Sequence, residues 1–219
     1  MQRQAAEWIR DQLVGAFGLP KAPDQDPVEL LVTTILSQNT NDANRDRAYS
    51  SLLATFGSLE CVADASEAAI ASAIRVAGLQ AQKARTLRDA LRRVRAKVGR
   101  LDLGFLARMS PEDALSWLEE SRGIGPKTAS IVLLFSFRRP FLPVDTHVGR
   151  VLRRIGAISA SGDAFRHANE ALPRDAGLLL DLHLLLIQLG RTLCRPRRPA
   201  CASCPLLRRC EHGRTAAET

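Results

Sequence analysis

The chain has 219 residues, 46% of them hydrophobic and 25% charged, with a formal net charge of +8 and a pI near 9.9. This length is enough to bury a core in one or two domains. No apolar run approaches the roughly 18 residues of a membrane span, and charges run through the N-terminal stretch. We therefore expect neither a membrane span nor a signal peptide, and an intracellular, cytoplasmic protein.

Helical spacing and capping residues recur along the chain. Apolar residues at helical spacing predict a first helix over 5–17. Asp26-Pro27 and Ser110-Pro111 are each typical of a helix start, with the polar residue as the N-cap. The segment Asp64–Glu67 predicts another start, and Gly78 is the expected end of that helix. Because alternation typical of strands is absent, we expect an all-α protein of roughly nine or ten short helices.

Basic residues cluster in two stretches. The first, 83–100, holds eight Lys and Arg residues opposed only by Asp89, and Gly99 is the expected end of its helix. The second surrounds the C-terminal cysteines and comprises Arg191, Arg195, Arg197, Arg198, Arg208, Arg209 and Arg214. Such clusters favour a polyanionic partner, because Lys and Arg contacts to phosphates release condensed counterions. A solvated helix face is the alternative, and it is the favoured interpretation of the first stretch taken alone.

Four of the five cysteines lie close together. Six, two and five residues separate Cys194, Cys201, Cys204 and Cys210, whereas Cys61 lies apart and is expected to be a small buried residue. Disulfides are not expected in a reducing compartment. Four thiolates suit either a tetrahedral zinc ion or a cubane iron–sulfur cluster. Zinc sites usually show two close pairs and here only one pair is close, so spacing alone leaves both open.

The segment Ser121–Ala129 predicts a helix–hairpin–helix. Gly123 and Gly125 allow a tight turn after the helix that Ser110 begins, and Pro126 suits the start of the next helix. Backbone N–H groups of such a turn can approach a phosphate at the positive end of the second helix. An ordinary turn between packed helices is the alternative.

Lys127 and Asp145 are the candidate catalytic residues. A lysine at the positive end of a helix is disfavoured as a cation, which pushes its pKa down and suits a nucleophilic amine. Asp145 follows 18 residues later within Pro143–Arg150. Without the lysine it would be interpreted as a helix cap; with the lysine it is a candidate for stabilising a cationic transition state or relaying a proton.

Together these segments resemble the endonuclease III family of bifunctional glycosylase/AP lyases in the helix–hairpin–helix superfamily. The resemblance rests on Ile35–Thr40, Gly123–Ala129, Val144–His147 and the cysteine spacing, over about 175 of 219 residues. It implies a two-lobed, all-helical fold: a six-helix lobe over 26–138 and a discontinuous cluster-bearing lobe from 1–25 and 139–219. It also implies a [4Fe–4S] cluster on Cys194, Cys201, Cys204 and Cys210 rather than zinc.

The resemblance also implies residue roles. By position Lys127 matches the family's Schiff-base lysine and Asp145 its catalytic aspartate. Leu79 and Gln80 lie in the loop that wedges into the space left by an extruded base. Gln38 and Asn39 lie where a family glutamine helps to fill that gap. The other implied DNA contacts are Arg122, Gly123, Gly125 and Thr128.

The implied partner is double-stranded DNA with a damaged base or an abasic site, bound by a monomer without a membrane. The implied activity is removal of oxidised pyrimidines followed by β-elimination. A monofunctional mismatch glycosylase is one alternative, but such relatives lack a lysine at the position of Lys127. Its adenine-specific members carry a further C-terminal domain, whereas this chain ends nine residues after Cys210. The second alternative is a catalytically silent DNA-binding iron–sulfur protein, and an intact Lys127–Asp145 pair argues against it.

Overall fold

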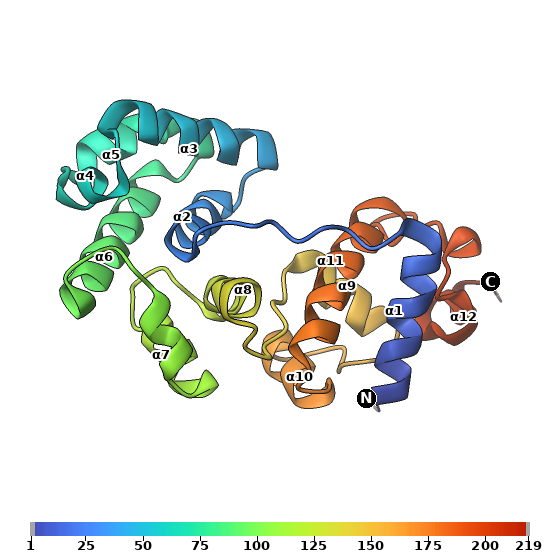
Figure 1. Cartoon of the computed structure of the whole chain (residues 1–219). Helices are drawn as coiled ribbons and strands as arrows, with labels where there is room; N and C mark the ends of the chain where they lie inside the picture. The colour runs from blue at the N-terminus through green and yellow to red at the C-terminus, as the bar shows by residue number, and fades with distance from the viewer. Residues whose placement is uncertain (1–2, 218–219) are drawn as a thin grey trace. The chain divides into compact units, whose positions relative to one another are not determined.

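A computed structural model describes residues 3–217, and every regular element in that range is helical (Figure 1). The α-helices are α1 (Arg3–Phe17), α2 (Pro27–Ser37), α3 (Asp42–Phe56), α4 (Leu59–Asp64), α5 (Glu67–Ala73), α6 (Gln80–Val98), α7 (Pro111–Glu119), α8 (Pro126–Phe137), α9 (Thr146–Arg154), α10 (Ala164–Ala171), α11 (Ala176–Thr192) and α12 (Glu211–Ala217). The 3-10 helices are η1 (Arg75–Ala77), η2 (Gly104–Arg108), η3 (Cys201–Ser203) and η4 (Leu207–Arg209). The all-α prediction is therefore confirmed. No described helix has the length and apolar character that crossing a membrane requires.

Backbone contacts divide the chain into two compact units. Asp24–Phe137 form one, here called the central unit, and Met1–Pro23 with Arg138–Thr219 form the other, the terminal unit. The boundaries expected from the sequence, between 25 and 26 and between 138 and 139, differ from these by two residues and one residue.

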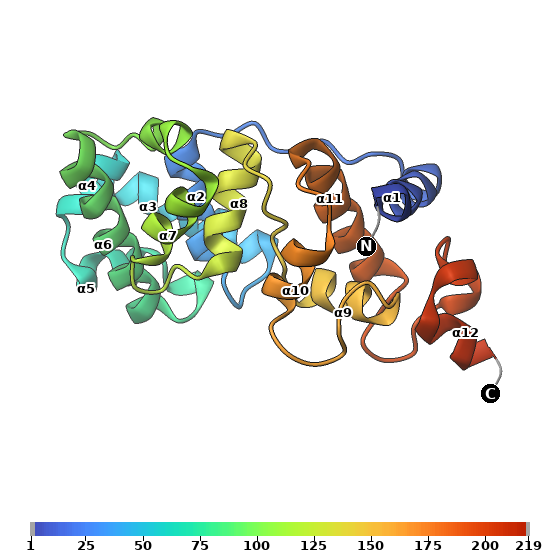
Figure 2. The same ribbon diagram turned by 90° about the horizontal axis from the view of Figure 1, so that it is seen from below.

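The buried helix of the central unit is α2. Eight of its 11 residues are buried, so it is enclosed nearly all round rather than amphipathic. It contacts α3, α6 and α8, and Figure 2 shows α8 beside it. Asp26 caps α2 as predicted, because its Oδ1 accepts hydrogen bonds from the N–H groups of Val28 and Glu29 at 2.8 and 3.2 Å. The end of α2, at Ser37, therefore has a fixed place in the core.

The core helix of the terminal unit is α11, which contacts both α1 and α9. Nine of its 17 residues are buried, most of them leucines. Since α1 comes from the start of the chain and α9 and α11 from its second half, the two separate segments share one hydrophobic core.

One expectation about helix boundaries is confirmed and one is wrong. A helix does begin within Asp64–Glu67: Asp64 ends α4, where its carboxylate accepts hydrogen bonds from Arg95 of α6, and α5 starts at Glu67. The cap of the next helix is Ser66, whose Oγ accepts from Ala69 N at 3.2 Å. That helix stops at Ala73, and η1 leads on to Gly78. Residues 3–217 consequently contain twelve α-helices rather than nine or ten.

Candidate functional site

The predicted hairpin joins α7 and α8. Ser110 caps the start of α7 and Gly99 ends α6, both as expected, and Gly123 adopts φ +86° in the turn between α7 and α8. A Cβ at Gly123 would overlap with Thr86 Oγ1 of α6, so this glycine is required for packing inside the protein. A Cβ at Gly125 would meet nothing within 4 Å. Gly125 is therefore the hairpin glycine that leaves open space for an incoming group.

Lys127 lies half-buried in the first turn of α8, a turn that contains no acidic residue. The neighbouring Thr128 is buried, and its Oγ1 accepts a hydrogen bond from Gln38 Nε2 at 3.3 Å. Gln38 Nε2 also donates to the carbonyl of Gly123 at 3.1 Å. The structure thus brings Gln38, Gly123 and Thr128 together and engages them within the protein, while Arg122 is exposed at the turn.

Two loops of the central unit contain exposed residues with left-handed backbone. Asn39 follows α2 with φ 52°, and Leu79 precedes α6 with φ 48°. The side chain of Leu79 remains 50% exposed, and Gln80 beside it is exposed in the first turn of α6. Positive φ is disfavoured for residues with a Cβ, and it accumulates at functional sites where the surrounding structure enforces it. These loops are therefore candidates for contact with a ligand.

Asp145 lies in the terminal unit as the N-cap of α9. Its Oδ1 accepts a hydrogen bond from Val148 N at 2.7 Å, whereas Oδ2 accepts none from the residues that the structure describes. The chain before it is held on both sides: His183 Nδ1 donates to the Pro143 carbonyl at 3.0 Å, and Asn169 bonds the N–H and the carbonyl of Leu142. His183 is 3% exposed, in agreement with a structural histidine. Asp145 therefore has one carboxylate oxygen fixed and one available.

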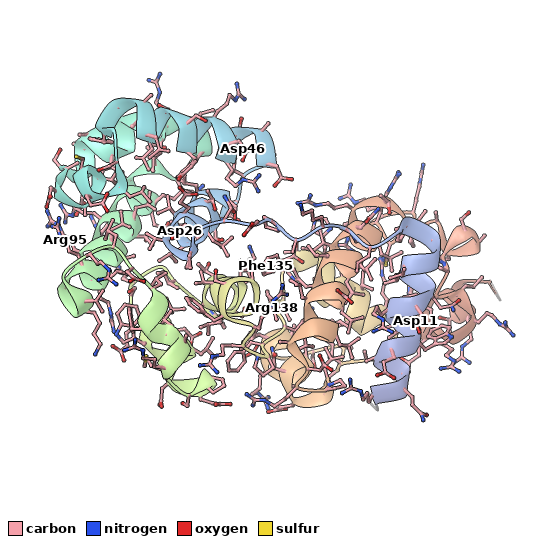
Figure 3. The ribbon with its side chains drawn as sticks, viewed as in Figure 1. Asp11, Asp26, Asp46, Arg95, Phe135 and Arg138 are labelled. Atoms are coloured by element: carbon pink, nitrogen blue, oxygen red, sulfur yellow. The ribbon has the colours of Figure 1, made fainter. Side chains whose placement is uncertain are left out.

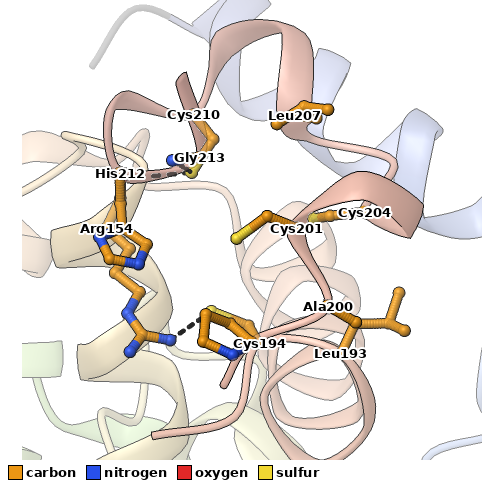
Figure 4. A pocket seen from close by; sticks show the side chains of 11 residues that line it. Arg154, Leu193, Cys194, Ala200, Cys201, Cys204, Leu207, Cys210, His212 and Gly213 are labelled. Atoms are coloured by element: carbon orange, nitrogen blue, oxygen red, sulfur yellow. Dashed lines mark hydrogen bonds between the residues drawn. The ribbon is translucent and has the colours of Figure 1, made fainter. Parts of the chain in front are cut away.

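The four clustered cysteines line one pocket (Figure 4). Burial raises the pKa of the Cys204 and Cys210 thiols. Donors face the sulfurs: Gly213 N lies 3.3 Å from Cys210 Sγ, and Arg154 Nη1 lies 3.3 Å from Cys194 Sγ. Cys61, expected to be buried, is exposed and belongs to the central unit.

Two arginines of α9 hold the cysteine loop. Arg150 Nε donates to the carbonyl of Cys194 at 2.9 Å, and Arg154 donates to the carbonyls of Arg195 and Pro196 at 2.7 and 3.0 Å. Neither arginine is among the site residues expected from the sequence. Their spacing of four residues, which places them on one face of a helix, is the signal that would have found them.

Most residues of the first basic stretch contact other parts of the protein, whereas the sequence alone favoured a solvated helix face for this stretch. Lys83 is buried, and Arg85 and Arg88 form ion pairs with Glu67. Arg95, labelled in Figure 3, pairs with Asp64. Arg93 likewise pairs with Glu120, and Arg92 donates to the Ala63 carbonyl. The stretch is used for contacts within the central unit.

The second basic stretch differs. Five of its exposed arginines form no ion pair with any acidic residue that the structure describes: Arg195, Arg197, Arg198, Arg208 and Arg214. Arg209 lies over the ring of Trp8, 4.5 Å from its centroid. This stretch therefore presents positive charge that the protein does not neutralise.

Comparisons with known proteins agree with these features. A family model described as "HhH-GPD superfamily base excision DNA repair protein" matches residues 32–174. The chain is 31% identical to endonuclease III of Thermotoga maritima over 190 residues, covering 86% of this chain and 84% of that protein. It is 35% identical over 176 residues to a putative DNA glycosylase of Arabidopsis thaliana, covering 79% of this chain but only 59% of that relative.

A solved structure of a trapped covalent intermediate of endonuclease III with DNA matches 99% of both chains, with a TM-score of 0.79 and 25% identity. Family, relatives and fold agree with one another and with the hairpin, the half-buried lysine and the cysteine spacing. The chain therefore belongs to the HhH-GPD superfamily of base excision DNA repair proteins and, within it, to the endonuclease III family of DNA glycosylases and AP lyases.

Proposed function

We propose that this DNA glycosylase removes oxidised pyrimidines and then nicks the abasic site by β-elimination, acting as a monomer on double-stranded DNA. The observation that carries the proposal is the placement of Lys127. It is half-buried, lies in the first turn of α8 and follows directly on the hairpin. A primary amine is what separates a lyase of this kind from a glycosylase that only hydrolyses, since only an amine forms a Schiff base with the sugar.

Binding begins at the hairpin. The backbone N–H groups around Gly125 and the positive end of α8 attract a phosphate, and the open space at Gly125 admits it. The exposed Leu79 enters the space that the extruded base leaves, and Asn39 faces the unpaired base on the other strand. Extrusion is necessary because the glycosidic carbon cannot be attacked within the stack, and damaged pairs open more easily.

The chemistry is nucleophilic displacement followed by elimination. The neutral amine of Lys127 attacks C1′ while the glycosidic bond breaks, and the base leaves with the bonding electrons and takes up a proton. The free Oδ2 of Asp145 stabilises the positive charge that develops on the sugar. Ring opening gives a protonated Schiff base, loss of a C2′ proton follows, and the C3′–O bond breaks. The strand is cut on the 3′ side, and water releases the enzyme.

We further propose that the four cysteines hold a [4Fe–4S] cluster. All four cysteines line one pocket, and four thiolates are the ligand set that such a cluster takes. Their spacing of six, two and five residues is part of the resemblance to the endonuclease III family. When bound, the cluster supplies four iron–thiolate bonds that hold the irregular 194–210 segment in place.

Borohydride trapping on DNA with a single abasic site tests the lyase. The wild-type protein should give a covalent complex and Lys127→Ala none. Lys97→Ala is the matched control, because Lys97 is an exposed lysine of the central unit on α6, and it should trap like wild type. Trapping of Lys127→Ala at the wild-type rate would assign the nucleophile to another amine. A wild-type protein that excises a base but is never trapped would be a monofunctional glycosylase.

A further inference from the structure

Lys83 is a buried lysine on α6 without an acidic partner. Its side chain is 1% exposed, and it takes part in no ion pair with a described residue. Its Nζ instead donates to two backbone carbonyls, those of Leu36 and Ala77, at 2.8 Å each. Burial lowers the pKa of this ammonium. An apolar side chain of similar length would fill the same volume without a buried charge. The presence of a lysine with two hydrogen bonds at this position therefore requires a physical explanation.

The two carbonyls belong to the ends of two different helices. Leu36 lies in the last turn of α2, and Ala77 is the last residue of η1. Carbonyls at helix ends lack intrahelical partners, and the Lys83 ammonium supplies one to each. The two carbonyls lie 47 and six residues before Lys83 in the sequence. Lys83 is therefore a link between two segments that are far apart in the sequence.

Each of these helix ends leads directly into a left-handed residue. Asn39 follows Leu36 by three residues, and Leu79 follows Ala77 by two. The backbone N–H of Lys83 also donates to the carbonyl of Leu79 itself, at 3.0 Å. Because left-handed backbone is unfavourable for leucine and is only tolerated by asparagine, both conformations depend on the structure around them. Lys83 is the residue whose hydrogen bonds reach the base of both loops.

The same part of α6 also supports the hairpin. Thr86, three residues after Lys83, occupies the space beside Gly123. In the loop after α2, Gln38 donates a hydrogen bond to the Gly123 carbonyl. Both loops and the hairpin are thus fixed against the first two turns of α6, within the central unit.

We propose that Lys83 is a positioning residue for base extrusion, which holds Asn39 and Leu79 together in the conformations from which they enter the duplex. The inference rests on the proposed function in assigning these two loops to the extruded-base gap. Lys83 touches no reacting atom. It acts by setting the spacing and backbone conformation of the two inserting residues.

Single-turnover excision from two duplexes tests this role. One carries thymine glycol opposite adenine, and the other carries it opposite an abasic-site analogue, where no base pair has to be opened. Lys83→Met keeps the apolar stem and removes the donors. It should slow excision from the paired duplex by about tenfold or more, the factor that corresponds to lost hydrogen bonds of a charged group. Excision from the unpaired duplex should stay close to the wild-type rate.

A general loss of folding would slow both reactions equally, so equal slowing overturns the proposal, as does no slowing at all. If Lys83→Met does not fold, Lys83→Gln serves instead. Its amide is one bond shorter and keeps at most one of the two hydrogen bonds, and the ratio of the two rates should shift in the same direction.

Hydrogen exchange of the free protein separates this inference from the proposed function. In Lys83→Met the amides of 38–40 and 78–80 should exchange faster together, whereas in Lys97→Met, the same change at an exposed position of α6, both loops should exchange as in wild type. Unchanged exchange in both loops overturns the inference. If wild type excises neither substrate, the proposed function is wrong, and the exchange result still decides whether Lys83 holds the loops.

Discussion

Asp145 is a helix cap and, in the proposed mechanism, also a catalytic residue, and a sequence alone cannot separate the two roles. Its Oδ1 caps α9 through Val148 N, so the interpretation as a helix cap is correct. Its Oδ2 accepts no hydrogen bond from a described residue, so the same carboxylate remains able to act on a substrate. Capping and catalysis are therefore compatible in this residue, and a substitution has to separate them.

Asp145→Asn makes that separation, because asparagine caps helices about as well as aspartate does. Thermal stability should stay near wild type. Affinity for DNA should be unchanged or higher, since a negative charge is removed. Base excision should fall by about 10² or more, the usual scale for losing an electrostatic or acid–base group. Single-turnover excision beside a binding titration measures both. Normal excision by Asp145→Asn would mean that the residue is only a cap, and Asp145→Ala should then lose stability alone.

At the level of elements, local signals in the sequence predicted local structure well. Asp26 and Ser110 cap their helices as expected, because a cap depends on hydrogen bonds to residues two or three positions away. Asp64, by contrast, ends α4 and pairs with Arg95, which lies 31 residues away on α6. No local sequence pattern predicts such a contact.

Lys83 shows the same limit of prediction from local sequence, but in this case the sequence also contained a signal of burial. Its charge grouped it with the solvated arginines of its stretch. Its position on the helix indicates burial instead, because Lys83 lies on the same face of α6 as four buried residues, Leu87, Ala90, Leu91 and Val94. Hydrophobic periodicity across the helix would have placed it inside. The two carbonyls that it binds come from tertiary structure, which the sequence does not reveal.

The two hairpin glycines should respond differently to alanine. Gly123→Ala places a methyl group on Thr86 Oγ1 at a positive φ, and we expect it to lower the free energy of unfolding by about 1–3 kcal/mol. Gly125→Ala meets nothing in the protein and should unfold like wild type, yet bind DNA more weakly because its Cβ points into the space for the phosphate. Denaturant unfolding and a binding titration of both variants measure this. Equal stability of the two variants would contradict the packing role of Gly123.

The cysteine loop should depend on its metal for structure. We expect a brown protein with four irons and four sulfides, which Cys204→Ser loses together with thermal stability of the terminal unit. Cys61→Ser is the matched control, since Cys61 is exposed outside the loop, and it should keep both colour and iron. Metal analysis with a visible spectrum decides the matter. A colourless protein with stoichiometric zinc would contradict the assignment.

Over the whole molecule, the basic residues that give the chain its net charge of +8 are not equally available to a polyanionic partner. Four of the five arginines of α6 pair with Glu67, Asp64 or Glu120 within the central unit. Around the cysteine loop, no such ion pair with a described residue is formed by Arg195, Arg197, Arg198, Arg208 or Arg214. Counterion release depends on charges that reach phosphates, so the second stretch should account for more of the salt dependence.

The slope of log affinity against log salt concentration measures how much each basic stretch contributes to phosphate binding. Each phosphate contact contributes about −0.9 to the slope on duplex DNA. Arg197→Gln and Arg208→Gln should each make the slope less steep by about that amount, without a change in thermal stability. Arg95→Gln is the matched control, because it removes the same charge from an arginine already bound to Asp64, and the slope should stay as in wild type. If Arg95→Gln flattens the slope and the two loop variants do not, then α6 is the face that meets the phosphates, and its ion pairs with Asp64 and Glu67 must open when DNA binds.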